Sequence, residues 1–292
     1  MAKQIFKYPR FITKEWEPFD AVELARLTEN IVCRREDSAR KYTAFYATGV
    51  YGGIATGYAV GCCLRCVFCW IELSREFPER YGEFFTPEEA YEHIVATAKK
   101  YGVRKARISG CEPTLCREHL IGLLEHIEDD RHIEIFILET NGILFGIDRD
   151  YVRDIFDRFD KVYVRLSLKA GTPEDFQRKT GARKGNFEIP FQAIRNIIDV
   201  VGIETLGKRW HVAAMSLDPR IMSPEERMSL LRKLIDIDMR ILVLLEEEIV
   251  DPYKTTLLRL KAAGLDLEWP IKKIYRPAKE IIRELLKESS SQ

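Results

Sequence analysis

The sequence lacks a long apolar run. The longest, "ILVLL" at 241–245, is far shorter than the roughly 20 residues that a membrane-spanning helix needs. The first twenty residues also contain no apolar core of the signal-peptide type. We therefore expect a cytoplasmic protein with no membrane partner.

An excess of charge of either sign is missing too. The chain has 46 Lys and Arg against 46 Asp and Glu, so nothing draws the whole molecule toward nucleic acid. Short basic clusters such as "CRRED", "GARKG" and "GKRW" leave RNA open as a partner. Charged residues reach 32% while Asn and Gln are scarce, a balance typical of thermophile proteins.

Cysteine is absent after residue 116. The chain has 7 cysteines, an odd number, and four of them lie within 61–70, so we expect no disulfide framework. The other three, Cys33, Cys111 and Cys116, are too dispersed for an auxiliary iron–sulfur cluster. We expect Cys33 in the core on the apolar stripe of a helix, and we assign no function to Cys116.

Strands and helices alternate along most of the 292 residues. An amphipathic helix at 20–37 and a β-hairpin at 41–61 come first. Thr86 and Glu89 predict a capping box at the start of the next helix. Strands are then expected at 103–109, 133–141, 161–169, 209–217 and 240–249, with helices between them.

Roughly six strand–helix units follow from this pattern, which is too few for a closed eight-unit barrel. We therefore predict an α/β fold, an open partial (βα)6 TIM-like barrel. The expected parts are an N-terminal helix and hairpin extension at 1–49, a barrel core at 50–250 and a short helical tail packed on the core at 251–292.

The strand expected at 161–169 has one polar face. Tyr163, Arg165, Ser167 and Lys169 alternate with apolar residues, and alternate side chains of a strand share a face. If the apolar face meets the helices, the polar face points into the barrel and indicates a cavity for a ligand with anionic groups. The alternative is an edge strand with a solvated face.

The stretch "GCCLRCVFCW" at 61–70 contains four of the seven cysteines. Cys62, Cys66 and Cys69 form C-x₃-C-x₂-C. Zinc sites normally take four ligands from paired knuckles, and the spacing of Cys111 and Cys116 is unlike a knuckle. Three thiolates would leave one iron of an iron–sulfur cluster free to bind a substrate or cofactor. A structural iron or zinc knuckle is the alternative.

With Phe68 as the aromatic residue, the motif C-x₃-C-x-aromatic-C resembles the signature of the radical S-adenosylmethionine (radical SAM) enzymes. The resemblance implies a [4Fe–4S] cluster on Cys62, Cys66 and Cys69, with the fourth iron chelating S-adenosylmethionine. Reductive cleavage of that cofactor would produce a 5′-deoxyadenosyl radical that abstracts a substrate hydrogen.

A second stretch, "RISGCEPTL", resembles the G-G-E-P motif of the same family, which holds the methionine amino group. Cys111 replaces the second glycine, and "LETNG" is also a familiar ending of the third strand. His211 and Met215 share a face of the strand expected at 209–217, where they would line the cavity near the adenine or the substrate. The alternative for His211 is a packed interior histidine. The expected cofactor-binding residues are Phe68, Gly110, Glu112, Pro113, Glu139, Asn141, Ser167, Lys169 and Met215.

The remaining candidates each have a plain alternative. We expect Cys63 to be a buried filler beside the cluster, with a redox or substrate-linking role as the alternative. Cys111 is either near the reaction centre or a small residue tolerated in place of glycine. The run Glu246, Glu247 and Glu248 is expected to be solvated, unless one of them contacts the adenosine.

The segment "VRLSLKAGTPEDFQRKTGA" resembles glycyl-radical activating enzymes, although Ser167 stands where an aspartate often precedes the lysine. This favours a protein substrate and a reductant such as ferredoxin or flavodoxin. Because "CVFCW" resembles the cluster loop of the enzyme that builds wybutosine, transfer-RNA modification is an alternative. Small-molecule or cofactor maturation is another, and a non-catalytic electron carrier is the remote one.

Overall fold

Six parallel strands form the centre of the fold, which a computed structural model describes over residues 8–282. They pair side by side in chain order, and the first and last of these described strands do not pair, so the barrel is open. This confirms the predicted partial barrel. The strands are β3 (Ile54–Ala59), β5 (Lys105–Ser109), β6 (Ile135–Thr140), β7 (Val162–Leu168), β8 (Trp210–Ala214) and β9 (Glu246–Glu247).

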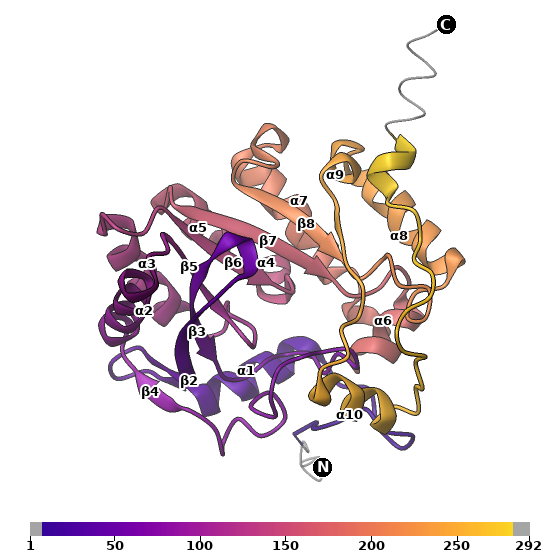
Figure 1. Ribbon diagram of the computed structural model, residues 1–292, viewed down its shortest axis with the longest axis horizontal. Helices are drawn as coiled ribbons and strands as arrows, with labels where there is room; N and C mark the ends of the chain where they lie inside the picture. Colours follow the sequence, from indigo (N-terminus) through magenta and orange to yellow (C-terminus); the bar gives the residue numbers. More distant parts are fainter. Residues whose placement is uncertain (1–7, 283–292) are drawn as a thin grey trace, which may run out of the picture.

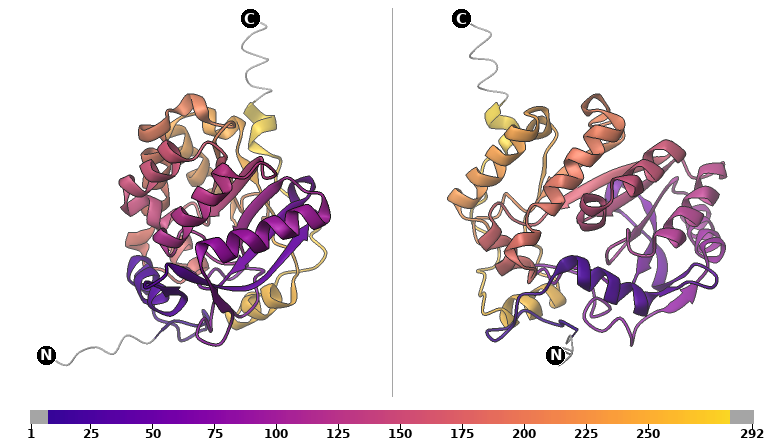
Figure 2. Two further views of the ribbon diagram at one scale, coloured as in Figure 1. Left: turned by 90° about the vertical axis from the view of Figure 1, so that its left-hand side faces the viewer. Right: turned by 180° about the vertical axis from the view of Figure 1, so that it is seen from behind.

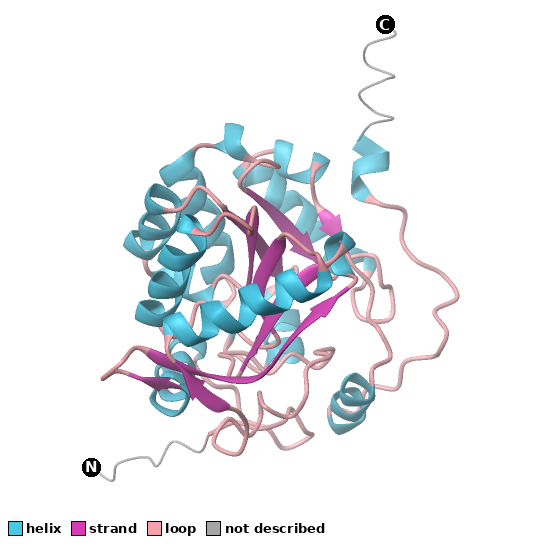
Figure 3. Cartoon of the chain, turned by 60° about the vertical axis from the view of Figure 1, so that its left-hand side comes forward, coloured by secondary structure: helices cyan, strands magenta, loops and turns pink. Residues whose placement is uncertain are grey.

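Helices cover the outer face of this sheet (Figures 1 and 3). The first of them confirms its predicted capping box, since Thr86 Oγ1 accepts from the Glu89 amide at 3.2 Å and the Glu89 carboxylate accepts from the Thr86 amide at 2.8 Å. The covering helices are α2 (Pro87–Tyr101), α3 (Arg117–Asp129), α5 (Arg149–Arg158), α7 (Ile189–Val201) and α8 (Pro224–Ile237).

The N-terminal part adds antiparallel strands to the same sheet. β2 (Ala39–Thr48) pairs with β3, which confirms the hairpin, and it also pairs with β1 (Cys33–Arg34) and β4 (Glu83–Phe85). The expected division between an extension and a core at residue 49/50 thus runs through one sheet, and it stays a proposal. Helix α1 (Ala21–Val32) lies across the lower rim (Figure 2).

Strand β7 has the two faces that its sequence predicts. Val164 and Leu166 are fully buried, and Leu168 is 1% exposed. Arg165 and Ser167, from the alternate positions, line a cavity inside the barrel instead. The alternative of a solvated edge strand is wrong, because β7 pairs with β6 on one side and β8 on the other.

The last strand is much shorter than predicted. The stretch expected as a strand at 240–249 begins with α9 (Arg240–Val243) and contributes only β9 to the sheet. The Asp238 carboxylate accepts from the Arg240 amide at 2.9 Å and starts the helical turn. A short apolar run cannot by itself distinguish a buried strand from a buried helical turn. The first helix is also shorter than predicted, because it ends at Val32.

One disulfide corrects the expectation drawn from cysteine counts. Cys33 and Cys116 are bonded across a sequence separation of 83, with their Cα atoms 5.6 Å apart. The bond joins the end of α1 to the residue before α3, so neither cysteine is the inert residue expected. The fold brings the two together through α1, which the sequence spacing does not reveal.

Four shorter helices lie between residues 143 and 262. None of the helices in the described part of the chain has the length and apolarity needed to cross a bilayer. The remaining short helices are α4 (Ile143–Ile147), α6 (Pro173–Thr180), α9 and α10 (Lys254–Ala262), with single 3₁₀ turns at Val50–Gly52, Lys184–Asn186 and Ile203–Thr205.

Candidate active site

One cavity lies at the carboxyl ends of the parallel strands. Its lining comes from the loop after β3 and from the ends of β5, β6, β7 and β8. Every predicted site residue except Pro113 lines it. Those residues are Cys62, Cys66, Phe68, Cys69, Gly110, Glu112, Glu139, Asn141, Ser167, Lys169 and Met215.

Several lining residues were missed or left undecided by the sequence analysis. Ser109 directly precedes the G-x-E-P stretch, and its alternation with buried Ile108 would have found it. Trp70 directly follows the third cysteine of the motif. Arg75 has no sequence signal, because it reaches the cavity only through the fold of the loop.

Residues 61–76, the cysteine loop, are held by packing against α1 at their start and by backbone hydrogen bonds to the end of α6. Gly61 has φ +89°, and a Cβ there would lie 2.6 Å from the Thr28 side chain, so α1 packs directly on the start of the loop. The Arg65 amide donates to the Thr180 carbonyl at 2.8 Å, and the Val67 amide donates to the Lys179 carbonyl at 2.9 Å. The end of α6 therefore determines where the middle of the loop lies.

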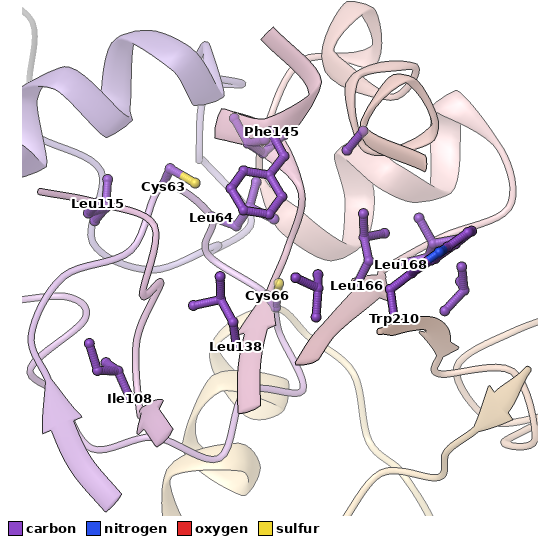
Figure 4. Close-up of a cluster of buried hydrophobic side chains, with 14 of the residues drawn as sticks. Cys63, Leu64, Cys66, Ile108, Leu115, Leu138, Phe145, Leu166, Leu168 and Trp210 are labelled. Carbon is purple, nitrogen blue, oxygen red and sulfur yellow. The ribbon is translucent and has the colours of Figure 1, made fainter. Parts of the chain in front are cut away.

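The three motif cysteines carry free thiols that line the same cavity. A hydrogen bond from Cys63 lowers the pKa of Cys62 to about 7, whereas burial raises the pKa of Cys66 to about 12. Figure 4 draws Cys63 and Cys66 among the buried apolar side chains. Cys63 is fully buried and accepts from Asn141 Nδ2 at 3.2 Å, as a packed residue beside the site.

This donor set fits an iron–sulfur cluster. Such clusters are held by thiolates, and three thiols on one cavity leave one iron of a [4Fe–4S] cluster without a protein ligand. Within residues 8–282, no group of three Cys, His, Asp or Glu is compact enough to hold a single metal ion. A cluster does not require such a group, because each thiolate binds a different iron.

The G-x-E-P loop is fixed from two directions. The Glu112 carboxylate accepts from the Thr114 and Thr140 hydroxyls, both at 2.6 Å, and from the Asn141 amide at 2.9 Å. Buried Arg40 donates to the carbonyls of Glu112 and Pro113, both at 2.6 Å. Pro113 is thus a backbone anchor that lies outside the cavity lining.

A polar network includes two residues of the cavity lining, Arg165 and Glu248. Arg165 donates to both carboxylate oxygens of Glu246, at 2.9 and 3.0 Å, and lies 2.7 Å from Glu248. His211 Nε2 lies 2.7 Å from Glu246, so His211 belongs to this network. Glu247 pairs with Arg227 at 2.8 Å. The expectation of a solvated glutamate run is wrong for Glu247, whose side chain is 3% exposed. Glu246 and Glu248 are 43% and 33% exposed, and both are paired as well.

A second charged pair lies across the barrel. Arg107 Nη1 and Ser109 Oγ donate to Glu139 at 2.9 and 3.1 Å, and Tyr51 donates to the same carboxylate at 2.5 Å. Lys169 differs from these residues, because its ammonium donates to the neutral Ser167 hydroxyl at 2.6 Å. Among the described residues, no carboxylate partner of Lys169 is present.

Comparison with known proteins agrees with this architecture. A sequence model of the Radical SAM superfamily matches residues 58–209. A "Probable GTP 3′,8-cyclase" of Methanocaldococcus jannaschii is 35% identical over 140 residues, covering 48% of this chain and 43% of the relative. A GTP 3′,8-cyclase of Desulforamulus reducens is 32% identical over 141 residues, covering 48% and 40%. The chain thus matches less than half the length of these relatives.

One solved structure supports the fold. SuiB of Streptococcus suis bound to S-adenosylmethionine matches with a TM-score of 0.50 at 20% identity, over 79% of this chain and 46% of SuiB. The Radical SAM sequence model spans just over half of the 292 residues. The chain therefore belongs to the radical SAM superfamily, whose cofactors are a [4Fe–4S] cluster and S-adenosylmethionine.

Proposed function

We propose that this radical SAM enzyme acts on a small molecule bound inside the barrel. The observation that carries the proposal is the convergence of three free thiols and the polar ends of the neighbouring strands on one cavity. When bound, the reduced cluster supplies the electron that cleaves S-adenosylmethionine into methionine and a 5′-deoxyadenosyl radical.

The chain's own residues have distinct roles in this proposal. Cys62, Cys66 and Cys69 hold the cluster. Lys169 pairs with the methionine carboxylate, since its charge is not compensated by a described carboxylate. Asn141 orients the start of the cysteine loop, because its side-chain amide donates toward both Cys62 and Cys63.

The remaining predicted cofactor contacts divide by position in the cavity. We assign the end of β5 to the methionine amino group and the ends of β6 and β8 to the adenosine. Gly110 and Glu112 follow β5, Glu139 belongs to β6 and Met215 follows β8, all on the cavity lining. Phe68 from the cysteine loop and Ser167 from β7 line the same cavity as further cofactor contacts, and Pro113 acts through its backbone.

A small-molecule substrate is favoured over the protein substrate expected at first. The relatives at 32–35% identity are named for a reaction of GTP, which is a small molecule. Of the charged side chains on the cavity lining, Arg75, Arg165 and Lys169 are basic and Glu112, Glu139 and Glu248 are acidic. Their formal charges cancel, so this lining has no excess of positive charge for a polyanion such as GTP, and only the small-molecule class is taken from the relatives.

We also propose a reductant and a location for the protein. Radical SAM enzymes need a reductant, and we propose ferredoxin or flavodoxin in that role. We place the protein in the cytoplasm, where both electron carriers are found. A protein substrate and transfer RNA are the competing substrate classes.

The test is formation of 5′-deoxyadenosine by the anaerobically reconstituted protein with S-adenosylmethionine and dithionite. A low-molecular-weight cell filtrate should raise the yield above the uncoupled background, whereas a protein fraction and a transfer-RNA fraction should not. A rise confined to the protein fraction would favour the activating-enzyme interpretation. A rise confined to the RNA fraction would favour base modification.

The ligand assignment is tested with paired cysteine variants. Cys66→Ala should lose the cluster absorbance and all 5′-deoxyadenosine formation, because the remaining two thiolates cannot hold the cluster. Cys63→Ala is the matched control and should keep the iron content of the wild type. Full cluster content in Cys66→Ala would contradict the assignment.

A further inference from the structure

Three charged side chains are buried together behind the cysteine loop. Arg75 and Glu76 end the loop, and Arg259 comes from α10, far along the chain. Arg75 and Arg259 are each 2% exposed, and Glu76 is fully buried. Arg259 donates to both oxygens of the Glu76 carboxylate, at 2.8 and 2.7 Å, and Arg75 Nε donates to the same carboxylate at 3.0 Å.

The two guanidinium groups also hold the backbone of the loop. Arg259 Nη1 donates to the carbonyl oxygens of Cys69 and Ile71, at 2.7 and 2.5 Å. Arg75 Nη1 donates to the carbonyl oxygen of Cys66 at 2.8 Å. The carbonyls of two of the three cluster-binding cysteines are therefore held by one buried ion triad.

Helix α10 adds neutral contacts of the same kind. Thr255 Oγ1 donates to the Trp70 carbonyl at 2.6 Å, and Thr256 Oγ1 lies 3.4 Å from the Cys69 carbonyl. Four consecutive carbonyls, from Cys69 to Glu72, thus face donors from this one helix. A loop that needed only packing would not require so many oriented donors.

The triad is not electrically neutral. Two guanidinium groups and one carboxylate leave one positive charge in a buried position, and such a charge is costly unless an anion compensates it. Arg75 lines the same cavity as the three thiols. Among the groups on that cavity, the thiolates that hold the cluster are the anions nearest to Arg75 along the loop.

We propose that Arg75, Glu76 and Arg259 are positioning residues for the iron–sulfur cluster, which hold the cysteine loop in its ligating shape and place one positive charge against the cluster. The proposal rests on the ligand assignment under Proposed function. Since reduction adds negative charge to the cluster, a nearby positive charge favours the reduced state, and net charge is one of the properties that set cluster potentials.

The experiment uses the full chain, reconstituted anaerobically and without S-adenosylmethionine. The fraction of reduced cluster is measured by electron paramagnetic resonance at a series of fixed solution potentials. In Arg75→Gln, the ratio of reduced to oxidised cluster should fall about tenfold at a given potential, which is 59 mV for a one-electron couple. Arg75→Lys keeps the charge and should change the ratio less than about threefold.

Glu76→Gln should change the ratio of reduced to oxidised cluster in the opposite direction, and glutamine has nearly the same shape as glutamate. The substitution removes the negative member of the triad, so the ratio of reduced to oxidised cluster should rise. This variant also keeps the proposal testable if Arg75→Gln fails to take up iron. A ratio that stays at the wild-type value in Glu76→Gln overturns the electrostatic part.

The holding role is measured separately, as the rate of iron loss to a chelator. Arg259→Lys keeps the charge but loses the planar fork that reaches several carbonyls, so its cluster should be lost at least several-fold faster. Lys261→Gln, on the exposed side of the same helix, should match the wild type in both measurements. Wild-type iron loss in Arg259→Lys overturns the positioning part.

The two proposals fail in different ways. If Cys66→Ala retains its cluster, the ligand assignment is wrong. If Cys66→Ala loses its cluster while Glu76→Gln and Arg259→Lys behave as wild type, only the role of the triad is wrong.

Discussion

At the scale of residues, the contacts of a side chain decide its chemistry, even between neighbours in the sequence. Cys62 and Cys63 are adjacent, yet only Cys62 lines the cavity, while Cys63 is buried against the Asn141 amide. His119 shows the same principle away from the site. Its Nε2 lies 2.7 Å from the Tyr42 hydroxyl and its Nδ1 lies 2.9 Å from the Ser38 carbonyl, so the neutral ring is held on both sides.

Burial, aided by the charge of Arg40, lowers the pKa of His119 from 6.5 to about 3. Below pH 6.5 the unfolded chain therefore binds a proton that the folded chain refuses, and stability falls as the pH drops toward 3. Above pH 6.5 this contribution is constant. Between pH 7.5 and pH 5 the free energy of unfolding should fall by about 2 kcal/mol from this residue.

The measurement compares urea unfolding of the wild type and His119→Gln at several pH values by circular dichroism. The other titrating groups are common to both proteins, so the difference between their pH slopes isolates His119. Equal slopes from pH 7.5 to pH 5 would show that the pKa of His119 is the same in the folded and unfolded protein.

At the scale of elements, the loops around the site are held by helices and strands that are distant in sequence. The end of α6 holds the cysteine loop through two backbone hydrogen bonds. Arg40 of β2 holds the G-x-E-P loop, and the disulfide joins α1 to the start of α3. The elements outside the six parallel strands therefore position the loops that carry the chemistry.

The disulfide should stabilise this arrangement measurably. A bond that closes a loop of this length contributes about 4.5 kcal/mol in the chain-entropy account, and removal of native disulfides typically costs about 2–5 kcal/mol. Cys33→Ala should therefore lower the free energy of unfolding by a few kcal/mol in non-reducing buffer. In reducing buffer, the wild type should fall to the level of the variant.

Thiol titration of the denatured protein tests the disulfide directly, because it counts the free cysteines. Under non-reducing conditions it should find the five free cysteines of the structure. If the wild type and Cys33→Ala are equally stable without reductant, the bond makes no contribution in solution.

At the scale of the whole molecule, ion pairs join strands inside the barrel. Arg165 of β7 reaches Glu246 and Glu248 at the last strand, and Arg107 of β5 reaches Glu139 of β6. These pairs leave a polar interior in an open barrel, which is suited to a ligand more than to a dry core.

Arg165→Gln should impair cofactor use and leave the cluster intact. Without the guanidinium, Glu248 on the cavity lining loses its ion pair and repels the cofactor carboxylate. At subsaturating S-adenosylmethionine, the rate of 5′-deoxyadenosine formation should fall about tenfold, equivalent to about 1.4 kcal/mol. Arg240→Gln, which breaks an exposed pair on the rim, is the control, and an equal effect of both variants would contradict the role of Arg165.

The sequence by itself determined the features that depend on local spacing. The three-cysteine motif, the G-x-E-P stretch, the capping box at Thr86 and the two faces of β7 all follow from residues a few positions apart. These are short-range patterns, and their physical cause is the geometry of a turn, a helix or a strand.

Only the tertiary structure decided the features that join distant segments. The Cys33–Cys116 bond spans 83 residues, and the contact of Arg259 with Glu76 spans 183. The short last strand and the pairing of its glutamates likewise depend on what packs beside them. Burial and charge compensation act through space, so no spacing rule could have predicted which side chains they would bring together.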